Sequence, residues 1–125
     1  MQTGFYKSRP IVADIGGCLL AAFTGTGDRV ALATAPGQPL AGITDTVGGK
    51  AGYGLVDLQL SEIADIRFGG TVAAGDPITA DAQGRGVKAV KPGAGATVYI
   101  IGFAQGPGVV DDIGKVLVAP QILLG

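Results

Sequence analysis

The chain has 125 residues, enough for one domain with a buried core. Nine basic and ten acidic residues are scattered singly along it, so no basic stripe exists and we expect no nucleic-acid partner. Its longest apolar runs have four to six residues, too few to span a membrane, so we expect no membrane partner. Cys18 is the only cysteine, which excludes an intramolecular disulfide and fits a reducing compartment. No signal peptide is visible at the N-terminus.

Residues 1–18 have no helical or strand periodicity and are predicted to form an extended arm that precedes a β-rich domain over residues 19–125. A frayed terminus is one interpretation. The other is an arm that lies on another subunit and adds a strand to a sheet there, because aromatic residues and arginine are typical interface anchors. The residues predicted to carry this contact are Phe5, Tyr6, Lys7, Arg9 and Pro10.

Short strands separated by glycine-rich turns are predicted for the rest of the first half, over residues 19–23, 29–33, 40–44 and 55–60. The segment 46–52 is a hairpin connector, because Lys50 is not followed by the Ser or Thr of a phosphate-binding loop. Residues 61–68 fit either a strand or one helical turn capped by Ser61, and we favour the strand.

Residues 69–88 form a turn-rich stretch with short strand candidates at 71–72, 77–79 and 86–88. Two more strands are predicted over 97–104 and 115–120, with a turn at 111–114 between them. Alternation assigns six side chains to the core: Val56, Leu58, Leu60, Val98, Ile100 and Val116. The pattern predicts an all-β fold of short strands, arranged as a small barrel or sandwich.

No catalytic chemistry is predicted. The chain lacks histidine, and the neighbouring carboxylates of Asp111 and Asp112 point to opposite faces of an extended chain. Asp76 and Asp81 could approach each other across a hairpin, but turn capping explains both without a Ca²⁺ ion. Arg85 and Lys88 are interpreted as solubilising charges. We therefore expect no enzyme, no catalytic residue, no cofactor and no metal site.

A family resemblance covers residues 10–121. The pattern GGTVAAGDPITADAQGR, followed by IIGFAQ and KVLVAP, resembles the head decoration (capsid cement) proteins of tailed bacteriophages. The resemblance implies a β-tulip type fold, a homotrimer and binding to the major capsid protein. It also implies a virion location on the outer capsid surface, after assembly in the bacterial host cytoplasm. A lipoyl-type domain is the weaker match, because residues 81–84 offer no lysine at the hairpin tip.

Self-association is predicted because apolar residues far outnumber charged ones, and a soluble monomer usually avoids large exposed apolar patches. A well-buried monomeric sandwich remains the alternative. The candidates for the subunit contact lie where small residues let backbones approach closely: Gly69, Gly70, Val72, Asp76 and Pro77. Two other function classes stay open, a small β-barrel binding module or adaptor of a cellular complex, and an accessory domain of an enzyme.

Overall fold

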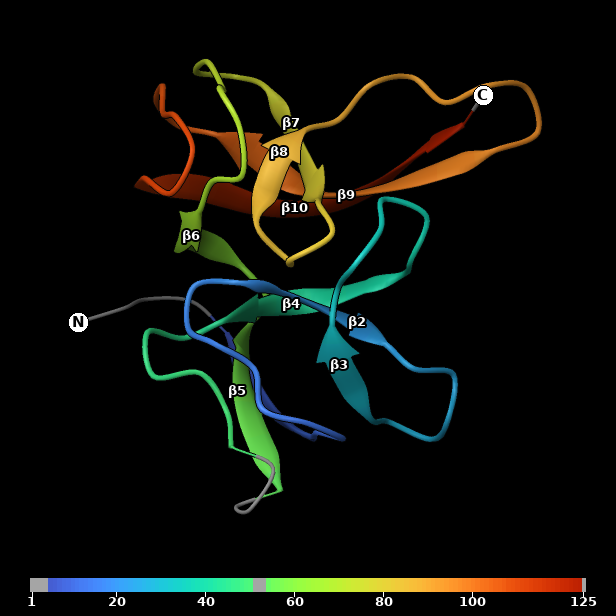
Figure 1. The fold of residues 1–125 in the computed structure, drawn as a ribbon, viewed down its shortest axis with the longest axis vertical. Helices are drawn as coiled ribbons and strands as arrows, with labels where there is room; N and C mark the ends of the chain where they lie inside the picture. Colours follow the sequence, from blue (N-terminus) through green and yellow to red (C-terminus); the bar gives the residue numbers. More distant parts are fainter. Residues whose placement is uncertain (1–4, 51–53, 125) are drawn as a thin grey trace.

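The computed structural model describes residues 5–50 and 54–124 and confirms the all-β prediction, with ten strands and no helix in these ranges (Figure 1). The strands are β1 (Tyr6–Pro10), β2 (Leu20–Phe23), β3 (Val30–Leu32), β4 (Leu40–Thr44), β5 (Leu55–Gln59), β6 (Glu62–Arg67), β7 (Pro77–Ala80), β8 (Gly86–Lys88), β9 (Thr97–Ala104) and β10 (Ile113–Leu124).

The strands form two five-stranded antiparallel sheets, which lie in the upper and lower parts of Figure 1. The first sheet has the order β1-β5-β4-β2-β3 and the second the order β6-β10-β9-β7-β8. Each sheet curls until a residue just past its first strand forms one isolated bridge to its last strand. A single bridge is not a ladder, so the described residues form no closed barrel. The two packed sheets are consistent with the predicted sandwich.

The N-terminal segment differs from the predicted arm. β1 pairs with β5 from Tyr6 opposite Gln59 to Pro10 opposite Leu55, and Ile11 and Ile15 are buried beyond it. The described part of residues 1–18 is therefore an edge strand and core of the first sheet, and no domain boundary falls at residue 18. The physical reason is non-local: β1 gains its hydrogen bonds from a strand about 50 positions away.

Several strand predictions are confirmed. Residues Glu62–Arg67 form β6 after a bend at Ser61, with Glu62 in the left-handed region at a φ of 61°, and Ala64, Ile66 and Phe68 are buried on one face. The six side chains assigned to the core by alternation are buried, except Leu60, which is half-buried. Residues 71–72 supply only an isolated bridge rather than a strand. β10 begins at Ile113, inside the predicted turn, and continues through a bulge to Leu124.

The two halves of the chain have the same topology. Raising each strand number of the first sheet by five gives the order of the second sheet. The isolated bridges also repeat: the parallel bridge Ile11–Val30 corresponds to Phe68–Gly86, and the antiparallel bridge Ile15–Gly49 corresponds to Val72–Gly108. We call β1–β5 with their connections the first module, and β6–β10 with theirs the second module.

Backbone hydrogen bonds support the equivalence. The amide N of Ile15 lies 2.9 Å from the carbonyl O of Gly49, and the amide N of Val72 lies 2.9 Å from the carbonyl O of Gly108. Glycine also recurs where a strand approaches its neighbour closely. A Cβ on Gly42 would lie 2.9 Å from the backbone oxygen of Gln59, and one on Gly102 would collide with the backbone oxygen of Leu117.

The modules pack head to tail. The main core combines the interior of the second module with one outer face of the first module, which contributes Leu20, Ala22 and Ile43. The interior of the first module forms a separate cluster that includes Val30 and Leu58. One module thus presents its outer face and the other its interior, so the contact between them is not symmetric.

Candidate interaction surfaces

Strand register defines one row of side chains across four strands of each module. In the first module the row runs Tyr6, Gln59, Ile43, Leu20, each opposite the next. In the second module the equivalent row runs Ile63, Leu117, Phe103, Pro77. The two rows occupy the same positions in the shared topology, so their surroundings can be compared residue by residue.

The two rows differ in what covers them. Leu20 and Ile43 are fully buried against the second module. In the second module Ile63 is 47% exposed and Leu117 is 41% exposed, with Phe103 and Pro77 half-buried. We call this second row the open row. It is an apolar strip on the outer face of the second sheet.

The open row is bordered by an ion pair on the same face, because Asp65 and Lys115 lie opposite each other two residues along β6 and β10. These two charges neutralise each other. The surface around the strip is thus apolar with locally balanced charge, a composition typical of protein interfaces rather than of binding sites for ions.

The first and second modules differ in the polarity of their equivalent strands β1 and β6. At the edge of the first module's interior, β1 carries charged side chains where β6 carries apolar ones. By register, Lys7 and Arg9 take the positions of Ala64 and Ile66, which are buried in the second module. The guanidinium carbon of Arg9 lies 4.9 Å from the ring centre of Phe23, a cation–π contact. The Nε of Arg9 is buried and has no hydrogen-bond partner among the described residues. We call Lys7, Arg9 and Phe23 the opening of the first module.

Of the predicted contact residues of the N-terminus, Phe5 precedes β1 and the other four belong to it. Phe5 is 77% exposed, while its amide donates to Ser61 Oγ over 2.9 Å and its carbonyl accepts from the Leu60 amide over 2.7 Å. The Tyr6 hydroxyl donates to Gln59 Oε1 over 2.9 Å. Burial, helped by Asp45 and Asp65, raises the pKa of that hydroxyl. Pro10 is half-buried at the end of the strand.

Most of the predicted subunit-contact residues serve the fold. Val72 is buried in the main core, so its side chain does not reach the surface. Gly69 donates its amide to the Gly86 carbonyl and packs against the Asp81 carboxylate. Asp76 accepts from the Ala73 amide over 2.9 Å, which caps a turn. Gly70 is half-buried. Pro77 alone of the five belongs to the open row.

Arg85 is a structural residue rather than a solubilising charge. Its Nε donates to Asp81 over 2.9 Å and its Nη1 donates to Asp111 over 3.2 Å, so it joins two turns. Its hydrogen bonds to these carboxylates raise the pKa of Arg85. Asp81 also accepts the amides of Gln83 and Arg85, as turn capping predicts. Among the described residues, no three metal-ligating side chains gather into a site.

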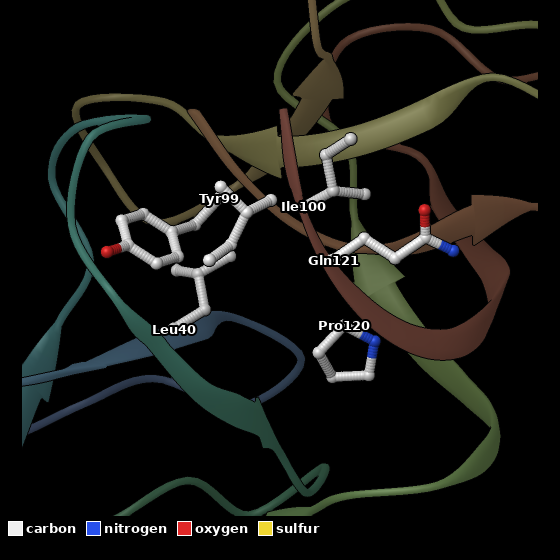
Figure 2. Close-up of a pocket in the computed structure, with 6 residues that line it drawn as sticks. Leu40, Tyr99, Ile100, Pro120 and Gln121 are labelled. Carbon is white, nitrogen blue, oxygen red and sulfur yellow. The ribbon is translucent and has the colours of Figure 1, made fainter. Parts of the chain in front are cut away.

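One pocket of about 250 Å³ lies between β4 and the bulged part of β10 (Figure 2). Figure 2 shows Leu40, Tyr99 and Pro120 around it, with the amide of Gln121 directed away from the tyrosine ring. The lining carries no charged side chain, so it suits an apolar side chain of a partner rather than an anionic cofactor. Its full lining is Leu40, Tyr99, Ile100, Pro120, Gln121 and Ile122.

The Cys18 thiol is not activated as a nucleophile. The residue is buried, and this burial, with a smaller effect of Asp65, raises the pKa of its thiol. A raised pKa lowers the fraction of reactive thiolate. Within the described ranges no helix is long and apolar enough to cross a membrane.

Comparisons with known proteins connect this architecture to a phage structural protein of known structure. No protein-family model matches the sequence, and no curated protein matches it. The fold is similar to that in the crystal structure of the N base of head fiber gp8.5 in bacteriophage phi29. The TM-score is 0.66, and the alignment covers 92% of this chain and 93% of that chain. The sequence identity is 13%, so the likeness is one of fold.

Proposed function

We propose that this protein is a structural component of a bacteriophage head. In this proposal it binds the major capsid protein on the outer surface of the capsid lattice as a homotrimer and stabilises the mature shell. The observation that carries the proposal is the fold shared with a phage head fiber base over nearly the whole of both chains. The resemblance of residues 10–121 to head decoration proteins supports it independently.

The mechanism is thermodynamic linkage. A protein that binds the assembled shell but not its free subunits stabilises the shell. When its free concentration exceeds the dissociation constant, this stabilisation grows with the logarithm of the ratio of the two. Three joined copies raise the effective concentration of each shell contact, so a weak contact per copy gives durable attachment.

Phe5 is the first residue we assign to the shell contact. It is an exposed aromatic side chain beside Tyr6 and Lys7, and its backbone is fixed to Leu60 and Ser61. An anchored backbone with a free aromatic side chain loses little conformational entropy on binding. Removing residues 1–15 would not test this role, because it would also remove β1 and the buried Ile11.

The test is cosedimentation with expanded, undecorated shells of the phage that encodes the chain. We expect saturable binding by the wild type and at least about tenfold weaker binding by Phe5→Ala. Val47→Ala is the matched control, since Val47 is 84% exposed in a turn of the first module. If the wild type does not sediment with shells, the proposed function is wrong. If Phe5→Ala binds like the wild type, only the assignment of Phe5 is wrong.

A further inference from the structure

Because the modules pack head to tail, two surfaces do not contact a module of the same chain. These are the outer row of the second module and the interior side of the first module. The outer row of the first module is covered at Leu20 and Ile43 by the interior side of the second module. The equivalent row of the second module, the open row, is exposed at Ile63 and Leu117 and half-buried at Phe103 and Pro77. The equivalent interior side of the first module, with its opening at Arg9 and Phe23, is not covered by a module either.

We propose that a second copy of this chain covers the open row, and that it does so with the opening of its first module. The contact would repeat between molecules the arrangement already present within one molecule. This inference deepens the proposed function, because it rests on the proposed self-association and names the two surfaces that carry it.

The internal contact supplies the geometric argument. The same topology places Phe103 and Pro77 where Ile43 and Leu20 lie, and those two residues already pack against the side of a module. The open row is apolar at each position, whereas the covered row includes the polar Gln59. If the open row were an ordinary solvent-exposed surface, we would expect it to be the more polar of the two rows.

The chemistry of the opening supplies the second argument. Where the second module has Ile66, the first module has Arg9, whose Nε is buried without an acceptor. Leaving a buried donor unpaired is costly, and a shift of the Arg9 side chain toward an oxygen of the second copy would satisfy it. Arginine stacked on an aromatic ring is also a typical anchor of protein interfaces.

Such a contact is heterologous, since two different surfaces meet. Heterologous contacts produce closed rings when the rotation closes and open filaments when it does not. Three copies would place six modules in a ring, which agrees with the proposed homotrimer. Each copy in the ring would use its open row once and its opening once.

The test uses variants of the full chain that damage one surface at a time. Leu117→Lys and Ile63→Lys put a charge into the open row at positions that are already partly exposed. Arg9→Glu and Lys7→Glu reverse the charge at the opening. Val47→Lys is the matched control on an exposed valine that belongs to neither surface. Thermal melting of each variant verifies that it is folded.

Sedimentation velocity at about 100 µM gives the readout. We expect a trimer for the wild type and the control, and at least about tenfold weaker association for a variant of either surface. The decisive sample is a 1:1 mixture of Leu117→Lys and Phe23→Lys, whose introduced charges have the same sign, so that the damaged row and the damaged opening repel each other. One intact open row then meets one intact opening, so the mixture should form heterodimers and nothing larger.

Three results would overturn the inference. A wild type that is monomeric at this concentration would refute self-association through these surfaces, while shell binding by the monomer would leave the proposed head function standing. Folded open-row variants that associate like the wild type would show that the row is not a contact. A mixture in which no heterodimer forms would show that the two surfaces are not partners.

Discussion

The two modules share strand order, bridges and close-approach glycines, yet they differ in what covers the same row of side chains. In the first module Leu20 and Ile43 of the row lie in the main core, whereas Phe103 and Pro77 at the equivalent positions of the second module are only half-buried. The role of a strand position in this protein is set by the surface that packs on it. An identical topology therefore yields one internal contact and one candidate external contact.

We expect the largest loss of stability from a substitution in the buried part of the first module's row. Ile43→Ala should lower the free energy of unfolding by about 2–5 kcal/mol, because Ile43 is fully buried between the modules. Phe103→Ala, at the equivalent position of the second module, removes more atoms but from a half-buried site. Urea unfolding of the dissociated protein should show the smaller loss for Phe103→Ala. An equal or larger loss for Phe103→Ala would mean that Phe103 is as buried as Ile43 in the dissociated protein.

The next effect tests whether the modules share a backbone requirement. Gly42→Ala and Gly102→Ala should each cost about 1–3 kcal/mol, since the added Cβ meets the backbone oxygen of the neighbouring strand. Gly106→Ala is the control, because nothing lies within 4 Å of a Cβ there. Thermal melting of the three variants provides the measurement. Tolerance of either strand substitution would argue against the equivalence of the two positions.

A smaller effect concerns the turn before the second strand of each module. Gly75 has φ of 88°, and Cys18 occupies the corresponding turn with φ of 59°. Gly75→Ala should cost about 1–2 kcal/mol, because a Cβ is strained in the left-handed region. Gly93→Ala, with free space around its Cβ, serves as the control. If Gly75→Ala is neutral in chemical unfolding, the left-handed turn is not a constraint of the module.

The smallest expected effect is a pH dependence that belongs to the first module. Burial raises the pKa of the Cys18 thiol above its ordinary value of 9.0, so the folded state keeps this proton more tightly than the unfolded state. The resulting stabilisation is complete below pH 9.0 and is lost as pH rises through the folded pKa. Cys18→Ala should flatten this decline in urea unfolding at pH values above 9.0. An unchanged slope would contradict the assignment, provided that Tyr6→Phe is measured alongside, because Tyr6 also has a raised pKa.

Much of the second module could be predicted from the sequence, because its strands carry local signals. Val98 and Ile100 are buried on either side of the half-buried Tyr99, and the turns at Asp76 and Asp81 use side chains that cap their own backbone. β1 could not be predicted in this way. Tyr6–Pro10 has no apolar alternation, and its place is fixed by pairing with Leu55–Gln59.

The repeated topology and the open row could not be predicted from the sequence either. The modules carry different residues at equivalent positions, such as Arg9 against Ile66 and Gln59 against Leu117, and only their register reveals the correspondence. The exposure of Ile63 and Leu117 depends on which module packs on which. Their alternation along β6 and β10 marks an outer face, but it does not distinguish a covered face from an open one.

The central claim is that the open row is buried by a second copy when the protein is in place on a head. The most direct measurement is an image reconstruction of decorated shells at a resolution that separates strands. The account predicts three copies around a three-fold position, with Leu117 and Phe103 of each copy packed against β1 of the next. Single copies on the shell, with the row Ile63–Leu117–Phe103 facing solvent, would contradict it.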